Sequence, residues 1–312
     1  MKTKVTENKF RSALGRVGQF FSMVALGAAI LTCSSTSAQN LFVSGKDAGG
    51  GEIFQFTWDG AESIFASGLY QPREVAFDSA GNLFVVDHMI LGGDFVNNVA
   101  IFKITPSGAV TVFASRVSYN SSLAVNQAGN LFVADYDAGV IYQYKPTGSR
   151  TIFASGLYHP VGLALDSGGN LYVASPSIGN IYQGSIYKYQ PDGSRVTVAA
   201  LDPGDRPSDL ALDSLGNLYI ADSGGNIYKY TLNGVLRRYP RTIFGSVPNS
   251  AQSLAFDSAG NLFVVDVGDA SGNGNAIYKF TPQGVRSTFA PGIDGVGDSF
   301  ACLAFQPIPC CQ

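Results

Sequence analysis

Charged residues are scarce in this sequence. They make up 14% of its 312 residues, well below the roughly 25% of an average globular domain. Basic residues do not outnumber acidic ones, and the formal net charge is −3. Because proteins that bind nucleic acid normally carry a basic surplus, we predict no nucleic-acid partner.

The common catalytic and metal-binding motifs are also missing. The sequence holds two His and four Cys. It contains no His-Glu-x-x-His, Gly-x-Ser-x-Gly or Cys-x-x-Cys and no Gly-Lys phosphate loop. We therefore predict no metal site and no cofactor, and the sequence assigns no catalytic residues by motif.

The first 38 residues have the composition of an export signal. Five basic residues flank or precede an apolar run from Phe20 to Cys33, and the small residues Thr36-Ser37-Ala38 follow it. A run of 14 residues is short for a membrane span, which needs about 20, but suits a signal core. We interpret 1–38 as a secretory signal peptide and predict a secreted or periplasmic protein. A buried N-terminal helix and a lipid anchor at Cys33 are the alternatives.

The remainder, 39–312, contains no second apolar run of spanning length. The signal segment holds five of the 20 basic residues and one of the 23 acidic ones, so removing it leaves a net charge of −7. We predict that this part of the chain does not span a membrane and that the protein is a monomer. Its net negative charge makes anionic surfaces poorer partners still.

A repeated phrase is the strongest signal in the chain. Asn-Leu-aromatic-Val, or a close variant, occurs six times at intervals of 40 to 48 residues, beginning at Asn40, Asn82, Asn130, Asn170, Asn217 and Asn261. A second phrase such as Ile141-Tyr142-Gln143-Tyr144 follows each copy, and a turn that ends in Gly comes next. Aromatic and β-branched residues favour strands, so both phrases predict strands.

Two further strands complete each unit. A short apolar segment such as Leu163-Ala164-Leu165 precedes the Asn-Leu phrase, joined to it by a Gly-Asn turn. A fourth segment such as Thr151-Ile152-Phe153-Ala154 closes the unit. Six repeats of four short strands predict an all-β fold, a six-bladed β-propeller.

The two chain ends predict how the ring closes. The first unit starts at Asn40 and lacks its inner strand, whereas an unmatched inner-strand phrase, Leu303-Ala304-Phe305, follows the last unit. We predict that this segment completes the first blade and protects its edge. The alternative, an open solenoid, leaves the match between the two ends unexplained.

The repeat resembles a known family. The segment from Leu157 to Asp166, running on to Asn170-Leu171-Tyr172-Val173-Ala174, is similar to an NHL repeat and to the repeats of SMP-30/gluconolactonase-like propellers. The resemblance covers nearly all of 39–312. It implies the six-bladed architecture, but these propellers include lactonases, lyases, oxidoreductases and binding scaffolds, so it does not imply one function.

The lactonase branch of that resemblance implies a divalent cation in the central channel. The positions that match its ligands are Arg73, Ser121, Val161, Ser208, Gln252 and Ala301. They include no carboxylate, which a hard cation usually requires, and an arginine would repel the ion. The next position along each inner strand holds Glu74, Ser122, Gly162, Asp209, Ser253 and Cys302. Glu74 and Asp209 could approach the channel if the register differs by one residue.

Loop lengths distinguish the two faces of the predicted ring. The turns between strands one and two, and between strands three and four, are nearly uniform. The connections between strands two and three vary, and the one in the second unit, from Asp87 to Ala100, is long. Variable loops gathered on one face of a rigid scaffold favour binding there. Drift in unconstrained loops is the alternative.

Six side chains are the candidate site residues on this face. The candidates for catalysis are Glu74, His88, His159 and Asp209, and those for ligand binding are Arg73, Glu74, Arg206 and Asp209. Surface histidines and salt bridges at the channel mouth explain the same residues without a function. Two recurrent sets of Asp, one after the second strands and one in the Gly-Asn turns, predict structural hydrogen bonds.

Three cysteines remain after removal of the signal: Cys302, Cys310 and Cys311. Export would permit a disulfide between Cys302 and either of the others, and the pairing stays open. The function predicted from the sequence is a binding scaffold for a protein, glycan or small ligand. The alternatives are an SMP-30-like hydrolase, lactonase or lyase that uses the central channel, and an extracellular assembly part.

Overall fold

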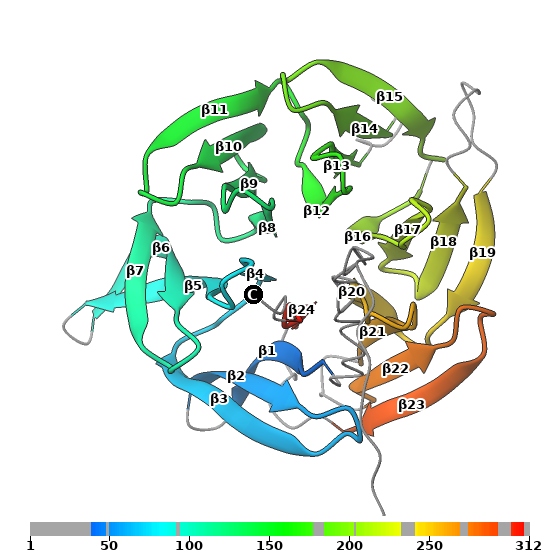
Figure 1. The fold of residues 1–312 in the computed structure, drawn as a ribbon, viewed down its shortest axis with the longest axis horizontal. Coiled ribbons are helices and arrows are strands. Elements are labelled where there is room, and N and C mark those ends of the chain that lie inside the picture. The colour runs from blue at the N-terminus through cyan, green and yellow to red at the C-terminus, as the bar shows by residue number, and fades with distance from the viewer. Residues whose placement is uncertain are drawn as a thin grey trace, which may run out of the picture. The chain divides into compact units, whose positions relative to one another are not determined.

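A computed structural model describes residues 39–47, 50–91, 94–176, 184–202, 204–231, 241–268, 274–292 and 301–308. The predicted signal segment 1–38 and the predicted lipid site Cys33 lie outside the described residues. The described residues form 24 strands in six four-stranded antiparallel sheets, which surround a common axis as the blades of a propeller (Figure 1).

Each blade is a meander whose first strand lies next to the axis. Blade 1 contains β24 (Leu303–Phe305), β1 (Leu41–Asp47), β2 (Gly50–Phe56) and β3 (Glu62–Leu69), and blade 2 contains β4 (Val75–Phe77), β5 (Leu83–Leu91), β6 (Asp94–Ile104) and β7 (Val110–Ser115). Blade 3 contains β8 (Ser122–Val125), β9 (Leu131–Asp135), β10 (Val140–Tyr144) and β11 (Arg150–Ser155), and blade 4 contains β12 (Val161–Leu165), β13 (Leu171–Ser175), β14 (Ser185–Tyr189) and β15 (Arg195–Ala200). Blade 5 contains β16 (Pro207–Leu212), β17 (Leu218–Asp222), β18 (Asn226–Tyr230) and β19 (Arg241–Ser246), and blade 6 contains β20 (Ser250–Phe256), β21 (Leu262–Val267), β22 (Ala276–Phe280) and β23 (Arg286–Pro291).

Burial explains why the second strands are continuously apolar. All five residues of β9, β13 and β17 are buried, because the neighbouring blades cover both faces of these strands. The outer strands begin with exposed residues, as the first three of β11 and β15 show. The hydrophobic core therefore lies between blades, and each cluster joins two of them.

The aromatic residue of the repeated phrase fastens adjacent blades. The ring of Tyr219 meets Phe244 of its own blade edge-on at 5.0 Å and Phe256 of the next blade at 4.9 Å. Phe263 repeats this pair of contacts with its own outer strand and with the closing strand. Phe42 makes the same contact with Phe77 of blade 2. Edge-to-face pairs at this spacing stabilise beyond their buried area, so the aromatic position of the phrase helps to join the blades at these three junctions.

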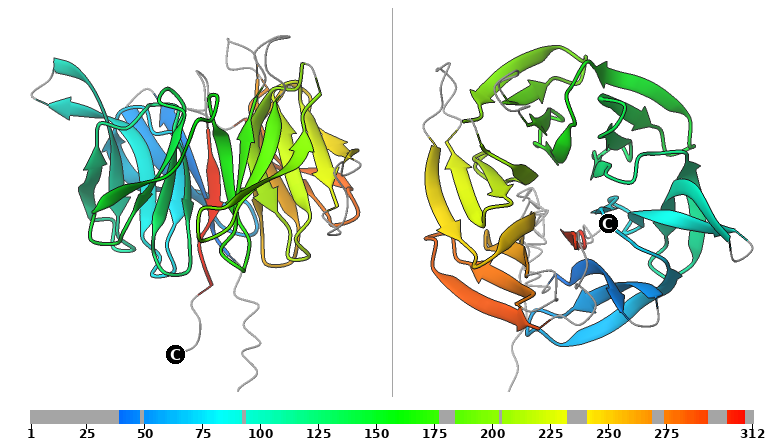
Figure 2. Two further views of the ribbon diagram at one scale, coloured as in Figure 1. Left: turned by 90° about the horizontal axis from the view of Figure 1, so that it is seen from above. Right: turned by 180° about the vertical axis from the view of Figure 1, so that it is seen from behind.

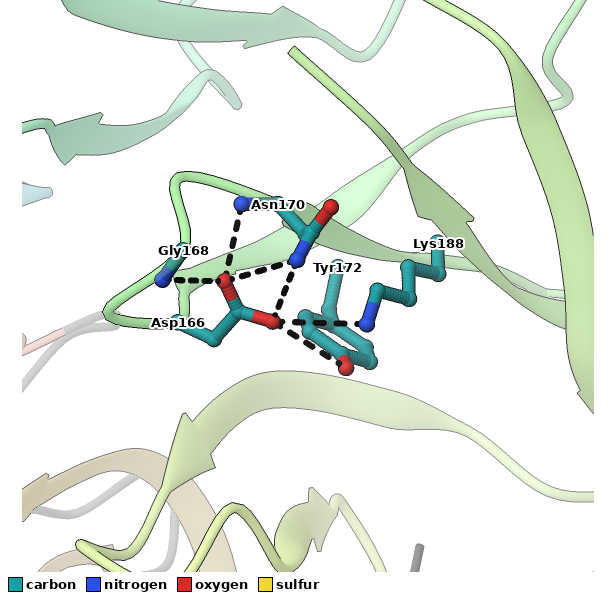
Figure 3. A network of polar contacts seen from close by, with 5 residues as sticks. All are labelled: Asp166, Gly168, Asn170, Tyr172 and Lys188. Atoms are coloured by element: carbon teal, nitrogen blue, oxygen red, sulfur yellow. Dashed lines mark hydrogen bonds and ion pairs between the residues drawn. The ribbon is translucent and has the colours of Figure 1, made fainter. Parts of the chain in front are cut away.

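The turn aspartates are structural, as predicted. In Figure 3 the carboxylate of Asp166 accepts hydrogen bonds from the backbone N–H groups of Gly168 and Asn170 and from the Asn170 side chain, and it pairs with Lys188 at 3.4 Å. The aspartates after the second strands bind loop backbone in the same manner. Asp87, for example, accepts from the N–H groups of Tyr70 and Gln71 at 2.8 and 2.7 Å.

The two ends of the described chain close the ring. β24 pairs antiparallel with β1, with Leu41 opposite Phe305 and Val43 opposite Leu303. The chain therefore completes blade 1 with its own C-terminal strand (Figure 1). This confirms the predicted number of blades and the predicted closure.

The connection predicted as a long loop in blade 2 is different. β5 and β6 continue past Asp87 and Ala100 as a paired hairpin that reaches Leu91 opposite Asp94, and Figure 2 shows it projecting from the ring. The two arms carry Ile90 on one side and Phe95, Val96 and Val99 on the other, which are residue types that favour strands. The variable connections 177–183 and 269–273 lie outside the described residues.

Within the described chain, no helix has the length and apolar character to cross a membrane.

Candidate functional site

A cavity of about 330 Å³ opens at the axis on the face that carries the variable connections. Its wall comes from the residues just before or at the start of the inner strands of blades 2 to 6, from the residues that follow the second strands of blades 3 and 5, and from Cys302. A propeller brings these segments together because every inner strand starts at the same end of the axis. The lining includes the side chains of Arg73, Glu74, Tyr119, Tyr136, Arg206 and Gln252.

Arg73 is held rigidly in this wall. Arg73 precedes β4 in the sequence, and the residue is only 9% exposed. The guanidinium carbon lies 3.7 Å from the centroid of the Tyr119 ring, and the guanidinium donates a hydrogen bond to the side-chain oxygen of Asn120. Burial lowers the pKa of Arg73, yet a guanidinium remains protonated in proteins. Contacts from blade 3 therefore hold the guanidinium of Arg73, which belongs to blade 2.

Glu74 lies beside Arg73 in the same wall. Its Oε2 accepts a hydrogen bond from the thiol of Cys302 at 2.9 Å. Burial, with the nearby charge of Asp209 as a second cause, raises the pKa of Glu74 from 4.5 to about 8. Burial also raises the pKa of the Cys302 thiol. At neutral pH Glu74 is therefore mostly a neutral acid.

Asp209 is buried next to the cavity and does not line it. Its carboxylate accepts hydrogen bonds from the N–H of Leu210 at 2.7 Å, the N–H of Leu254 at 2.8 Å and the hydroxyl of Ser253 at 2.9 Å. Burial raises the pKa of Asp209 to about 6, against the effect of these bonds. Since Leu254 and Ser253 belong to blade 6, Asp209 joins the inner strands of two blades.

Arg206 lines the opposite wall, before β16. Its backbone N–H donates to Asp222 at 2.7 Å, which fixes the chain at this point. The residue itself is exposed, and its guanidinium forms no ion pair with the described residues. Arg206 therefore gives the cavity a second cation, and a hydrogen bond to Asp222 fixes the backbone of this residue.

The two histidines are set back from the cavity. The ring of His88 lies 4.2 Å from that of Tyr119, and the ring of His159 lies 4.1 Å from that of Tyr136. Neither imidazole is among the described residues that line the wall. Burial lowers the pKa of His88. The structure thus brings Arg73, Glu74 and Arg206 to one cavity, with Asp209 beneath it and both histidines behind tyrosines.

Sequence reasoning missed Tyr119, Asn120 and Tyr136. All three lie where blade 3 meets the variable face, just before its inner strand or just after its second strand. Their place in the repeat is the only signal that could have found them, because no motif surrounds them.

The wall does not fit the divalent cation that the lactonase resemblance implies. Arg73 occupies one of the matching positions and lines the cavity together with Ser121, Ser208 and Gln252. The serine hydroxyls, which donate hydrogen bonds to the carbonyls of Ser118 and Ala251, and the amide of Gln252 are neutral ligands. In the part of the chain that the structure describes, no three His, Cys, Asp or Glu side chains converge. A hard cation prefers several oxygens, usually with a carboxylate, and these four matching positions offer no carboxylate and hold an arginine.

Cys302 is a free thiol. Its predicted disulfide partners, Cys310 and Cys311, lie outside the described residues.

Comparison with known proteins identifies the fold. No protein-family model matches the chain, and no curated protein matches its sequence. A chain of a nidogen–laminin complex superposes with a TM-score of 0.67 at 17% identity, over 88% of this chain and 100% of that one. A gluconolactonase from Xanthomonas campestris gives 0.58 at 18% identity, over 72% and 77% of the two chains. A streptogramin B lyase gives 0.52 at 18% identity, over 80% and 72%. The chain is therefore a six-bladed β-propeller that shares its fold with a chain of the nidogen–laminin complex, with a gluconolactonase and with a streptogramin B lyase.

Proposed function

We propose that the protein is a binding protein whose variable face takes a small anionic ligand at the mouth of the central channel. The observation that carries the proposal is the position of Arg73, whose cation lines the cavity while Tyr119 and Asn120 hold it in place. Placing a charge where water is scarce costs free energy. An anionic ligand would recover that cost through charge-assisted hydrogen bonds.

The charge of the wall supports the same choice. Glu74 is the only acidic side chain among the described residues that line the cavity, and its pKa of about 8 leaves it mostly neutral at pH 7. Two arginines, Arg73 and Arg206, line the same cavity. The cavity is therefore cationic in a chain whose net charge is −3, and overall composition does not account for that contrast.

Size and shape agree with a small molecule. A volume of about 330 Å³ falls at the lower end of the range of roughly 300–1,000 Å³ for ligand pockets. Tyr136 adds aromatic surface, and Gln252 and Asn120 add hydrogen-bonding amides. A sugar acid combines an anionic group with hydroxyls and apolar ring faces, so acidic glycans and sugar acids are the first candidates.

A thermal-shift series tests the proposal. Galacturonate, gluconate and lactate are compared with galactose and galactitol at matched ionic strength. We expect the acids to raise the melting temperature of the native chain and the neutral sugars to have less effect. Arg73→Gln should abolish the shift, and Arg73→Lys should restore part of it. Arg195→Gln, which alters an arginine stacked on Tyr187 of an outer hairpin, is the matched control and should bind as the native chain does. Equal shifts for acids and neutral sugars would contradict the proposal.

A second function, that of a lactone hydrolase or a lyase, is favoured by one observation. Glu74 is a carboxyl group in the cavity whose pKa of about 8 is close to a working pH, as general acid–base catalysis requires. An assay with a panel of sugar lactones tests the hydrolase, and an assay with a panel of acidic glycans, read by the absorbance of the unsaturated product, tests the lyase. Turnover that Glu74→Gln abolishes and Arg195→Gln leaves intact would support this function, and the absence of turnover across both panels would remove it.

A further inference from the structure

Two arginines face each other across the cavity. Arg73 precedes β4 of blade 2, and Arg206 precedes β16 of blade 5. In a ring of six blades these two are three steps apart in either direction, and Figure 1 shows β4 and β16 on opposite sides of the axis. The two cations therefore approach the cavity from opposite walls, so neither duplicates the contact of the other.

The two arginines differ in how they are held. Arg73 is buried and clamped by Tyr119 and Asn120. Arg206 is exposed, its backbone is tied to Asp222, and its side chain has no ion-pair partner in the described chain. A rigid cation suits a fixed anchoring contact. A flexible one can adjust to the far end of a ligand, because a long side chain samples many rotamers at the rim.

The wall between the arginines combines polar side chains with apolar surface such as Val161 and Pro207, and Glu74 is the one carboxyl group among the described residues that line it. Ser208 and Gln252 line it on the side of blades 5 and 6, and Tyr136 lines it from blade 3. An anion bound by either arginine would therefore not lie beside a lining carboxylate that is ionised at neutral pH, because Glu74 is mostly protonated there. Like charges on opposite walls of an otherwise neutral cavity match a ligand that has an anionic group at each end.

We propose that the cavity is selective for dianionic small molecules, with one anionic group held by Arg73 and the other by Arg206. The class includes dicarboxylic acids, with or without hydroxyls along the chain. This inference rests on the proposed function and deepens it, because it names the ligand class of the same site. It makes Arg206 a specificity-determining residue and Arg73 the shared anchor.

Calorimetric titration of the native chain tests this with paired probes. Straight-chain dicarboxylates of four, six and eight carbons and the dicarboxylate galactarate are each compared with the monocarboxylate of the same length. We expect one dicarboxylate length to bind up to about tenfold more tightly than its monocarboxylate, since a second charge-assisted hydrogen bond contributes about that factor and an exposed one contributes less. Arg206→Gln should remove this preference and leave monocarboxylate binding within about twofold. Arg206→Lys should restore part of the preference, and Arg73→Gln should weaken both probes.

The outcomes separate the two proposals. If monocarboxylates and dicarboxylates bind equally at every length, or if Arg206→Gln weakens both equally, dianion selectivity is wrong and anion binding stands. If no carboxylate binds, both proposals are wrong. Arg206 is exposed, so its variants should keep the melting temperature of the native chain, which excludes misfolding as the cause. Arg195→Gln again serves as the control for the loss of one positive charge.

Discussion

The thiol of Cys302 donates a hydrogen bond to the carboxyl group of Glu74, with 2.9 Å between Sγ and Oε2. The two residues lie 228 positions apart in the sequence. Cys302 immediately precedes the strand that closes blade 1, and Glu74 immediately precedes the inner strand of blade 2. The contact therefore links ring closure to the ionisable group of the cavity.

The first prediction concerns pH. The folded chain raises the pKa of Glu74 from 4.5 to about 8 and that of Asp209 from 3.8 to about 6. Between the unfolded and folded values the native state binds more protons than the unfolded state, so the free energy of unfolding falls as pH rises. The contribution of these groups is complete below about pH 4 and is lost progressively up to about pH 8.

Urea unfolding of the native chain and of Glu74→Gln at pH 5.5, 7 and 8.5 isolates the contribution of Glu74. We expect the variant to gain stability relative to the native chain as pH rises, because an amide cannot ionise. A difference between the two proteins that is constant across this range would show that Glu74 does not titrate there.

The second prediction concerns ring closure. Leu303 is 5% exposed and packs in the cluster that joins blades 1 and 6. Leu303→Ala should lower the free energy of unfolding by about 2–4 kcal/mol, as buried truncations to alanine do. Leu215, in a turn of blade 5, is 86% exposed, so Leu215→Ala is the control and should change stability by less than about 0.5 kcal/mol. Equal effects at the two positions would argue against closure by this strand.

The third prediction concerns the junction between blades 4 and 5. Gly162 has a φ of +58°, and a Cβ there would lie 2.9 Å from the backbone nitrogen of Leu210. Gly162→Ala therefore combines left-handed strain, about 1–2 kcal/mol, with a backbone collision. Gly156 has a φ of +74° and open space around it, so Gly156→Ala should show the strain alone. Chemical unfolding should find Gly162→Ala clearly less stable than Gly156→Ala.

The fourth prediction concerns the thiol. Burial and the charges of Glu74 and Asp209 raise the pKa of Cys302, so iodoacetamide should alkylate it more slowly than an exposed cysteine. Glu74→Gln removes one of these negative charges and should speed the reaction at pH 8.5. Peptide mass spectrometry after timed alkylation measures the rate. An unchanged rate in the variant would mean that Glu74 does not control the thiol.

The repeat explains how much of the fold is visible in the sequence. Strands, turns and blade number follow from local patterns such as Asp166 to Asn170, whose hydrogen bonds span four residues. The closure follows because Leu303 to Phe305 matches the strand that the first unit lacks. The hairpin of blade 2 differs from the predicted loop because the length of the connection from Asp87 to Ala100 is typical of a loop, whereas the strand propensity of its residues favours a hairpin.

The site is only partly visible in the sequence. Arg73, Glu74 and Arg206 were found because their place in the repeat puts them at the channel mouth. Tyr119 and Tyr136 were missed, and so was the contact from Cys302 to Glu74, because these depend on side-chain directions at blade junctions. The repeat gives the position of a residue around the ring, but it does not tell which side chain fills the space between two blades.

Protection of Cys302 is the most direct test of the central claim, because this thiol lines the cavity in which the anion is proposed to bind. The measurement is the alkylation rate of the Cys302 peptide at pH 8.5 in the native chain, with and without a saturating carboxylate ligand, and with Arg73→Gln as the variant that should not bind. The account predicts that the ligand slows alkylation several-fold in the native chain and has no effect in Arg73→Gln. A ligand that saturates the native chain and leaves the Cys302 rate unchanged would place the binding site elsewhere and contradict the account.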